Sequence, residues 1–209
     1  MSEIEFIIFD MDEVFYDYDH QIRLDLLEDL TGRPASDIDQ SVWGGPHEAA
    51  AEAGTPDTAE GYLKQYGDLL GHPIEFETWV DIRRQMMQGR EQMFQLARDL
   101  KRHIDLALLT NNGMMLKAAL PDCAPEMIEI FGEKAHVSAE FKARKPDPVV
   151  YGRVCARYGY MPGRCLFVDD KLENVEGAER AGLAVHHYKT YHGFLSCLHE
   201  SGLPISRRV

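Results

Sequence analysis

The chain has 209 residues, of which 44% are hydrophobic and 27% are charged, a composition typical of a globular protein and not of a disordered one. Its formal net charge of −13 repels nucleic acid and anionic lipid surfaces, so neither is expected as a partner. There is no basic leader before an apolar stretch, and no run reaches the roughly 18 apolar residues of a membrane span, which predicts a cytoplasmic protein.

Short apolar runs along the chain have the character of strands that are buried on both faces of a sheet. The four runs are residues 6–9, 106–109, 165–168 and 183–185. Helical patterns separate the later runs. They cover residues 91–100, 148–158, with Asp147 as the N-cap, and 172–181. Strands that alternate with helices predict an α/β fold with a doubly wound parallel sheet.

Residues 17–87 have a different pattern, with no convincing strand and with candidate helices at 21–30, 58–70 and 77–87. An insertion directly after the first strand would cover the carboxyl end of the sheet, where open α/β folds bind ligands. We therefore expect a core of residues 1–16 and 88–209 and a helical cap of residues 17–87. Its hinges are expected near residues 16–18 and 87–89. Candidates for the lining of a pocket, although more often core residues, are Trp43, His47, Tyr62 and Trp79.

The cysteines and the late histidines show no spacing typical of a metal site. The cysteines, which we expect to be buried thiols in a reducing compartment, are Cys123, Cys155, Cys165 and Cys197. The histidines, which we expect to be ordinary packed or exposed residues, are His186, His187 and His192.

Polar side chains follow three of the expected strands at the point where each strand ends. In chain order these are Asp10 and Asp12, Thr110 and Asn111, and Asp169 and Asp170. The carboxyl ends of parallel strands lie side by side, so we expect these side chains to converge on one cleft. Converging carboxylates repel one another unless a cation keeps them ionised.

A hard divalent cation suits this set, and a few carboxylates without a dense cage favour Mg²⁺ over Ca²⁺. With the metal neutralising a phosphoryl oxygen, Asp10 could attack phosphorus and form an aspartyl-phosphate. Asp12 is placed to protonate the leaving oxygen and then to activate water. Lys145 could share the remaining negative charge.

Four separated motifs, in order, resemble those of the haloacid dehalogenase superfamily of phosphatases. They are residues 9–14 (FDMDEV), 108–112 (LLTNN), 145–148 (KPDP), and 167–170 (FVDD) with Asn174. The resemblance implies a Rossmann-like core with a helical cap, similar to the sugar-phosphatase and nucleotidase-like members. It also implies magnesium as cofactor and a small phosphorylated molecule as substrate.

The resemblance also implies roles for single residues. Asp10 would attack and bind Mg²⁺, and Asp12 would bind it through the backbone carbonyl while its side chain transfers protons. Asp170 would bind the metal directly, Asp169 through water or by orientation, and Asn174 would support these ligands. The residues expected to hold the phosphoryl group are Thr110, Asn111 and Lys145.

The sequence departs from the family at Glu13, where glycine is usual. The glutamate is tolerable if it has an ordinary β or bridge conformation and points away from the site, and it adds a carboxylate near the site. The expected function is a Mg²⁺-dependent phosphatase acting on a sugar phosphate or nucleotide. A phosphomutase, or a weakly active phosphate-binding regulatory protein whose site Glu13 blocks, are the alternatives. A C–halogen dehalogenase is disfavoured, because that reaction needs neither an acid at Asp12 nor a metal. The particular ester and the oligomeric state, monomer or homodimer, stay open.

Overall fold

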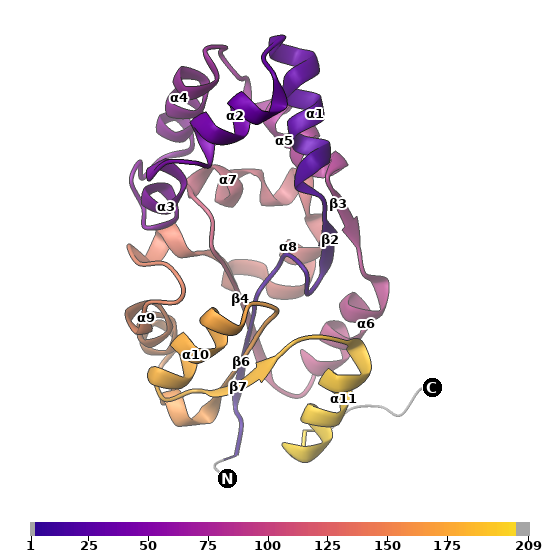
Figure 1. Ribbon diagram of the computed structural model, residues 1–209. Helices are drawn as coiled ribbons and strands as arrows, with labels where there is room; N and C mark the ends of the chain where they lie inside the picture. Colours follow the sequence, from indigo (N-terminus) through magenta and orange to yellow (C-terminus); the bar gives the residue numbers. More distant parts are fainter. Residues whose placement is uncertain (1–2, 204–209) are drawn as a thin grey trace.

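The computed structural model describes residues 3–203 and has an α/β fold built on a five-stranded sheet (Figure 1). The sheet order is β5-β4-β1-β6-β7, and each strand pairs in parallel with its neighbours. Its strands are β1 (Phe6–Phe9), β4 (Asp105–Thr110), β5 (Ala135–Val137), β6 (Cys165–Asp169) and β7 (Ala184–His187). The predicted fold class is therefore confirmed.

Sequence reasoning located four of these strands and missed β5. The first predicted strand matches β1, and the predicted runs 106–109 and 165–168 lie within β4 and β6. The prediction for β7 began one residue early and ended two residues short of His187. β5 has three residues with a histidine in the middle, which is too short and too polar to be recognised by an apolar run.

Successive residues of the central strands face opposite sides of the sheet and enter two separate hydrophobic clusters. Ile7 and Phe9 of β1 belong to one cluster, and Phe6 and Ile8 belong to the other. Helices α9 (Pro148–Tyr158) and α10 (Leu172–Arg180) cover the second cluster, whereas α6 (Glu91–Leu100) and α11 (Tyr191–Glu200) lie on the opposite side of the sheet, as Figure 1 shows. Both faces are buried, which explains why these strands read as continuous apolar runs.

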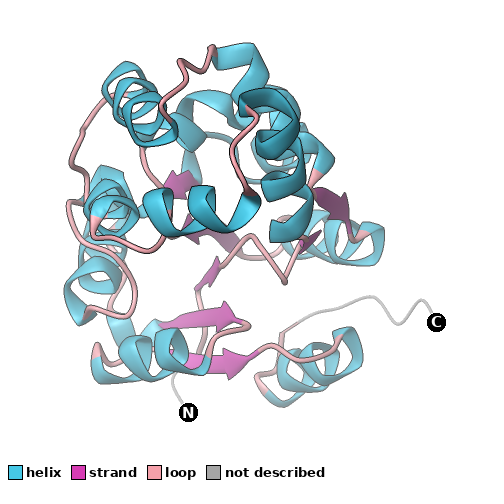
Figure 2. Cartoon of the chain, turned by 45° about the horizontal axis from the view of Figure 1, so that its top comes forward, coloured by secondary structure: helices cyan, strands magenta, loops and turns pink. Residues whose placement is uncertain are grey.

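Helices surround the sheet on both sides (Figure 2). The core helices are α6 (Glu91–Leu100), α7 (Met114–Cys123), α8 (Pro125–Phe131), α9 (Pro148–Tyr158), α10 (Leu172–Arg180) and α11 (Tyr191–Glu200), with short 3-10 turns η1 (Gly132–Lys134), η2 (Ser138–Phe141) and η3 (Pro162–Arg164). The predictions for α6 and α9 match both ends, and the prediction for α10 is one residue too long. Asp147 caps α9 as predicted, because its side chain accepts a hydrogen bond from Val149 N at 2.9 Å.

Five further helices follow β1 in the chain and precede the remainder of the core. They are α1 (His20–Thr31), α2 (Ala35–Val42), α3 (His47–Glu52), α4 (Ala59–Leu70) and α5 (Phe76–Gln85). An antiparallel pair, β2 (Tyr16–Tyr18) and β3 (Met87–Gly89), connects them to the core. The expectation of no strand in residues 17–87 is therefore wrong at both ends of that range. These strands are three residues long, so no period-2 pattern could reveal them.

These helices pack against the core through α7, which α4 and α5 both contact. One hydrophobic cluster runs without a break from Leu27 and Ile38 in α1 and α2 to Phe9 and Leu108 in the sheet. Apolar contacts therefore hold helices α1 to α5 against the core.

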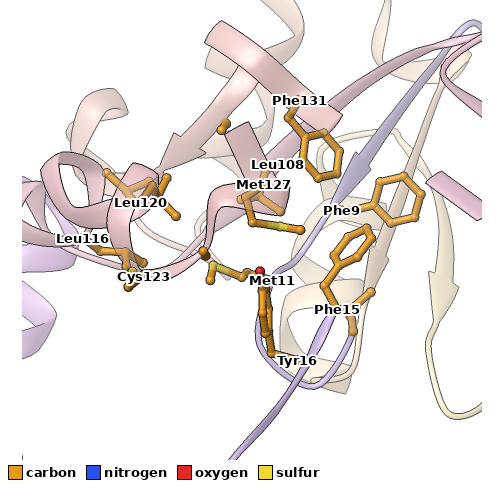
Figure 3. Packing of buried hydrophobic residues seen from close by; sticks show 14 of the residues in the cluster. Phe9, Met11, Phe15, Tyr16, Leu108, Leu116, Leu120, Cys123, Met127 and Phe131 are labelled. Atoms are coloured by element: carbon orange, nitrogen blue, oxygen red, sulfur yellow. The ribbon is translucent and has the colours of Figure 1, made fainter. Parts of the chain in front are cut away.

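The loop after β1 is fixed by apolar side chains that pack against residues of α7 and α8 (Figure 3). Met11, Phe15 and Tyr16 are buried among residues of α7 and α8, and the rings of Phe15 and Phe131 meet edge to face at 5.5 Å. Because Met11 enters the core, its polar neighbours on either side are left facing the cleft. Apolar packing thus orients the two candidate catalytic carboxylates.

The cysteines are free thiols, and three of the four are buried as predicted. Cys197 is half-buried, so the expectation is wrong for this residue. Within residues 3–203, no helix combines the length and the apolar character that crossing a bilayer requires.

Candidate active site

A buried ion triad lies at the carboxyl end of the central strands. Lys145 Nζ is 2.7 Å from an Asp10 oxygen and 2.7 Å from an Asp169 oxygen. Asp10 directly follows β1, Asp169 ends β6, and Lys145 comes from the loop before α9. The structure thus brings together three of the predicted site residues, from three distant parts of the chain.

The charges of this triad do not balance within the protein. Burial and the nearby Asp169 raise the pKa of Asp10 above its ordinary value, and Lys145 opposes them. Burial alone would lower the pKa of Lys145, but the two carboxylates raise it, so the lysine stays protonated. Burial, followed by the charge of Asp169, also raises the pKa of Asp170. Several carboxylates share one lysine, which leaves an excess of negative charge.

This donor set fits a divalent cation. One carboxylate oxygen from each of Asp10, Asp169 and Asp170 lies within 4.8 Å of the others. Hard oxygen ligands of this kind suit Mg²⁺. Asp12 does not belong to this carboxylate cluster, and the role predicted for its backbone carbonyl stays a prediction.

Asp169 is held from three sides. Besides Lys145, its carboxylate accepts hydrogen bonds from Lys171 N at 2.8 Å and from Asn174 Nδ2 at 3.1 Å to each oxygen. Asn174 therefore supports Asp169, one turn into α10. Asp170 is less buried and lines the cleft, and His187 hydrogen-bonds its carbonyl at 2.8 Å. The sequence analysis gave His187 no place at the site, because its partner is a backbone atom that no spacing rule reveals.

Asn111 fixes the backbone of Lys145. Its Oδ1 accepts from Lys145 N at 2.8 Å, and its Nδ2 donates to Lys145 O at 2.9 Å. Helix α10 also presses on this turn, since a Cβ added at Gly177 would lie 2.3 Å from Pro146 O. Glycine allows this close approach, and the lysine is thus placed from both sides.

Thr110 ends β4 and is 2% exposed, and its hydroxyl accepts a hydrogen bond from Asn112 Nδ2 at 2.9 Å. Thr110, Asn111 and Lys145 all line the cleft that contains Asp10. That these three hold a phosphoryl group is still a prediction.

Asp12 faces an arginine that the sequence analysis missed. Nη2 of Arg83, in the last turn of α5, donates to both Asp12 oxygens at 2.8 Å. Arg83 is 2% exposed, stacks on Tyr18 at 4.9 Å, and its buried Nε has no hydrogen-bond partner among the described residues. Burial opposes the charge of Arg83, but Asp12 keeps the pKa of this arginine above its usual value. Arg83 shares one face of α5 with the apolar residues Trp79 and Ile82, and this pattern is the sequence signal that could have revealed its burial.

Glu13 does not have the ordinary β or bridge conformation that would make it tolerable at this position. Its φ of +60° lies in the left-handed region, which explains why glycine is usual at this position and costs a non-glycine residue about 1–2 kcal/mol. Its carboxylate accepts hydrogen bonds from Tyr18 N at 3.1 Å and from Arg90 Nη2 at 2.8 Å. Arg90 also pairs with Asp17 at 2.5 Å. Glu13 therefore ties the loop after β1 to the two connecting strands.

The cleft is a polar cavity of about 340 Å³ between the sheet and the helices above it. The residues that reach it from the segment between β1 and β3 are Asp12, Glu13, Tyr18, Arg23, Trp43, Glu48, Glu52 and Arg83. Of the four aromatic and histidine candidates, Trp43 lines the cavity. Tyr62 and Trp79 are buried in the hydrophobic cluster, and His47 contacts Gln65 at 3.1 Å.

Sequence comparison links the chain to known enzymes. The family profile of the haloacid dehalogenase-like hydrolases matches residues 4–182. N-acylneuraminate-9-phosphatase of Rattus norvegicus is 30% identical over 107 residues, which are 50% of this chain and 42% of the rat protein. The chain thus spans less than half of the length of the curated relatives that it matches.

Two solved structures share the fold over nearly the whole chain. An HAD-like family hydrolase from Porphyromonas gingivalis has a TM-score of 0.77 and 20% identity, with 95% of this chain and 98% of that chain covered. An HAD family enzyme from Bacteroides thetaiotaomicron, in complex with magnesium and inorganic phosphate, has a TM-score of 0.74 and 19% identity, with 90% and 96% covered. The match of the family profile, in agreement with this fold, shows that the chain belongs to the haloacid dehalogenase-like hydrolases.

Proposed function

We propose that the chain is a Mg²⁺-dependent phosphatase that hydrolyses a small phosphorylated metabolite through an aspartyl-phosphate on Asp10. The observation that carries this proposal is the triad of Asp10, Lys145 and Asp169 at the strand ends, beside Asp170 and open to a cavity of about 340 Å³. The relatives named above support the chemistry, because one is a phosphatase by name and another binds magnesium and phosphate.

Four residues of the core have tasks in this reaction. The Asp10 carboxylate attacks phosphorus, and the ammonium group of Lys145 holds that carboxylate in place and offsets charge on the phosphoryl oxygens. Thr110 supplies a hydroxyl at the same edge of the sheet. Asn111 keeps Lys145 in position and has one N–H free for the phosphoryl group. A bound Mg²⁺ would neutralise a phosphoryl oxygen.

Asp12 transfers protons, and Arg83 fixes the position of its carboxylate. Two charge-assisted hydrogen bonds from Arg83 occupy both oxygens of the carboxylate that accepts a proton from water in the second half of the reaction. Protonation of the leaving oxygen in the first half requires Asp12 to carry a proton. We therefore expect a bound ester to draw Arg83 away from Asp12.

Residues 17–87 act as a cap in this proposal, on a core of residues 1–16 and 88–209. Side chains from both parts line the cavity, so separation of the two parts would widen the entrance for an ester. The hinge would lie at the pair of strands β2 and β3, where Arg90 joins Glu13 to Asp17. Crystals grown with and without a phosphate mimic should differ in cap angle, and identical angles would contradict this hinge.

The test is phosphate release from an aryl phosphate and from a panel of metabolite phosphates, with Mg²⁺ and with a chelator. Asp10→Asn should lose at least about 100-fold in kcat, because the nucleophile is removed. Asp122→Asn, an exposed residue of α7, is the matched control and should retain activity. Turnover that survives Asp10→Asn excludes the assigned nucleophile.

The same panel separates the alternatives. A phosphate ester that is isomerised without net release of phosphate identifies a phosphomutase. Binding of phosphate without turnover of any ester identifies a regulatory protein. Halide release without Mg²⁺ identifies a dehalogenase.

A further inference from the structure

Arg23 is a buried cation in the wall of the cavity that has no anionic partner within residues 3–203. It lies on α1, is 8% exposed, and borders the same cavity as Asp10. Its Nε donates to Met86 Sδ at 3.1 Å, a weak acceptor. Its guanidinium stacks on Tyr18 at 5.7 Å and on Trp43 at 5.1 Å.

The other buried or half-buried cations of the cavity wall are paired. Arg83 binds Asp12, Arg144 binds Glu52, and Lys145 binds Asp10 and Asp169. The Arg23 side chain is mostly buried, but its Nη groups are not among the buried atoms without a partner in the described chain, so they remain open to a ligand. An anion supplied by a ligand would balance the charge of Arg23.

The geometry of Arg23 leaves a defined set of donors free. The rings of Tyr18 and Trp43 meet the guanidinium, and its Nε is used by Met86, so its two terminal Nη groups remain. Two Nη groups in one plane form a fork that matches the two oxygens of a carboxylate.

Glu48 adds a second requirement nearby. Its Oε1 accepts a hydrogen bond from Tyr62 at 2.6 Å, and its other oxygen has no partner among the described residues. Glu48 lines the cavity, and the charge of Arg23 partly offsets the effect of burial on the pKa of Glu48, but the two side chains form no direct ion pair. A carboxylate oxygen that borders a cavity can accept from a ligand hydroxyl. It would also repel a second phosphate, which carries more negative charge than a carboxylate.

We infer that Arg23 binds a carboxylate of the substrate, so that the ester is a phosphorylated hydroxy acid whose hydroxyls reach Glu48. This inference rests on the proposed phosphatase function, since it names a second group of the substrate whose phosphoryl group would lie at Asp10. The cavity of about 340 Å³ restricts the substrate to a small molecule.

The test compares two open-chain esters that differ in one group, gluconate 6-phosphate, which has a carboxylate, and glucitol 6-phosphate, which has a hydroxymethyl group in its place. Wild-type enzyme should favour the gluconate ester. In Arg23→Met the ratio of the two kcat/KM values should fall about 30-fold, mainly through KM, the size expected for a charged hydrogen-bonded pair. Arg23→Lys retains the charge without the fork and should fall less. Arg84→Met, an exposed arginine of α5, should leave the ratio unchanged.

A second readout does not depend on turnover. Calorimetric binding of both esters to Asp10→Asn protein should show tighter binding of the gluconate ester, and Arg23→Met should remove that preference while the melting temperature reports whether the variant is folded. Equal binding of the two esters overturns the inference. If an aryl phosphate is hydrolysed but the gluconate ester is not preferred over the ester without a carboxylate, the inference about Arg23 is wrong and the proposed function stands. If no ester is hydrolysed, the proposed function is wrong.

Discussion

The two walls of the cavity are built in opposite ways. On the core side Asp10, Lys145 and Asp169 are buried, and each is bound by at least one charged neighbour at 2.7 Å. On the cap side Arg23 has free Nη groups and Arg83 has a buried Nε without a partner in the described chain. The three residues of the core triad, which belong to the core wall, bind one another, although their charges do not balance without a cation, whereas the wall formed by residues 17–87, the cap wall, has donors without partners in the described chain.

This difference separates chemistry from recognition. A network of paired groups holds reacting groups in place before a ligand arrives, which is what phosphoryl transfer needs. In the proposed function residues 17–87 move as a cap, and unpartnered donors on this cap that are satisfied by a ligand would favour its closure. Substitutions in the core wall should therefore weaken turnover of every ester, and substitutions in the cap wall should act according to the ester.

The largest effect is expected for Lys145→Met, which leaves two buried carboxylates without their cation. The unfolding free energy, measured with a chelator present, should fall by about 3–5 kcal/mol, and turnover of every ester should fall by at least about 1,000-fold. The control Lys101→Met removes an exposed lysine and should change stability by less than about 0.5 kcal/mol. An unchanged urea midpoint in Lys145→Met would show that the triad does not stabilise the core.

Arg83→Met tests the contact between the two walls. It removes two hydrogen bonds that position the Asp12 carboxylate, so kcat should fall about 10- to 100-fold, and the pH dependence of kcat should change because Asp12 is the proposed proton-transfer group. Arg84→Met, one residue along the same helix and exposed, is the control. Equal pH profiles for Arg83→Met and wild type would contradict a role through Asp12.

The core wall was the part that sequence could predict. Asp10, Thr110 and Asp169 each stand at the end of a strand that an apolar run marks, and parallel strands bring such ends together. Lys145 has no strand to mark it, and it was found through a motif of four residues. The pairing of Asn111 with the lysine backbone was not foreseen, because spacing carries no information on hydrogen bonds to the main chain.

The cap wall could not be predicted to the same degree. Arg23 and Arg83 lie in helices that also have charged residues on their exposed sides, so composition does not distinguish a buried arginine from a solvated one. Arg83 shares a helix face with Trp79, but Arg23 has Leu27 alone at a spacing of four. The conformation of Glu13 could not be predicted, because the sequence showed the exchange for glycine but not the backbone angle that Arg90 helps to hold.

Gly177→Ala sharpens the comparison by disturbing the core wall without removing a charge. The new methyl group would meet Pro146 O, so the turn that carries Lys145 must shift. We expect a loss of about 1–3 kcal/mol in stability and about 10-fold in kcat. Gly152→Ala in α9, with nothing within 4 Å of its Cβ, should instead stabilise by up to about 1 kcal/mol. The same sign for both substitutions would contradict the role of close packing.

The smallest effect concerns Glu48, which is on the cap wall. Burial raises the pKa of Glu48, and the opposing influences of Tyr62, Arg23, Arg83 and His47 do not offset it. The pKa of Glu48 is therefore higher in the folded state than in the unfolded state. Below the unfolded pKa the carboxyl is protonated in both states and does not lower the stability. As pH rises from the unfolded pKa through the folded pKa, wild type loses stability relative to Glu48→Gln. Melting temperatures between about pH 4 and about pH 8 should show a growing advantage of the variant.

Glu77→Gln, exposed on α5, should show a constant difference from wild type, because general charge repulsion affects both alike. A constant difference for Glu48→Gln as well would mean that Glu48 ionises freely, and the cap wall would then be better solvated than its burial indicates.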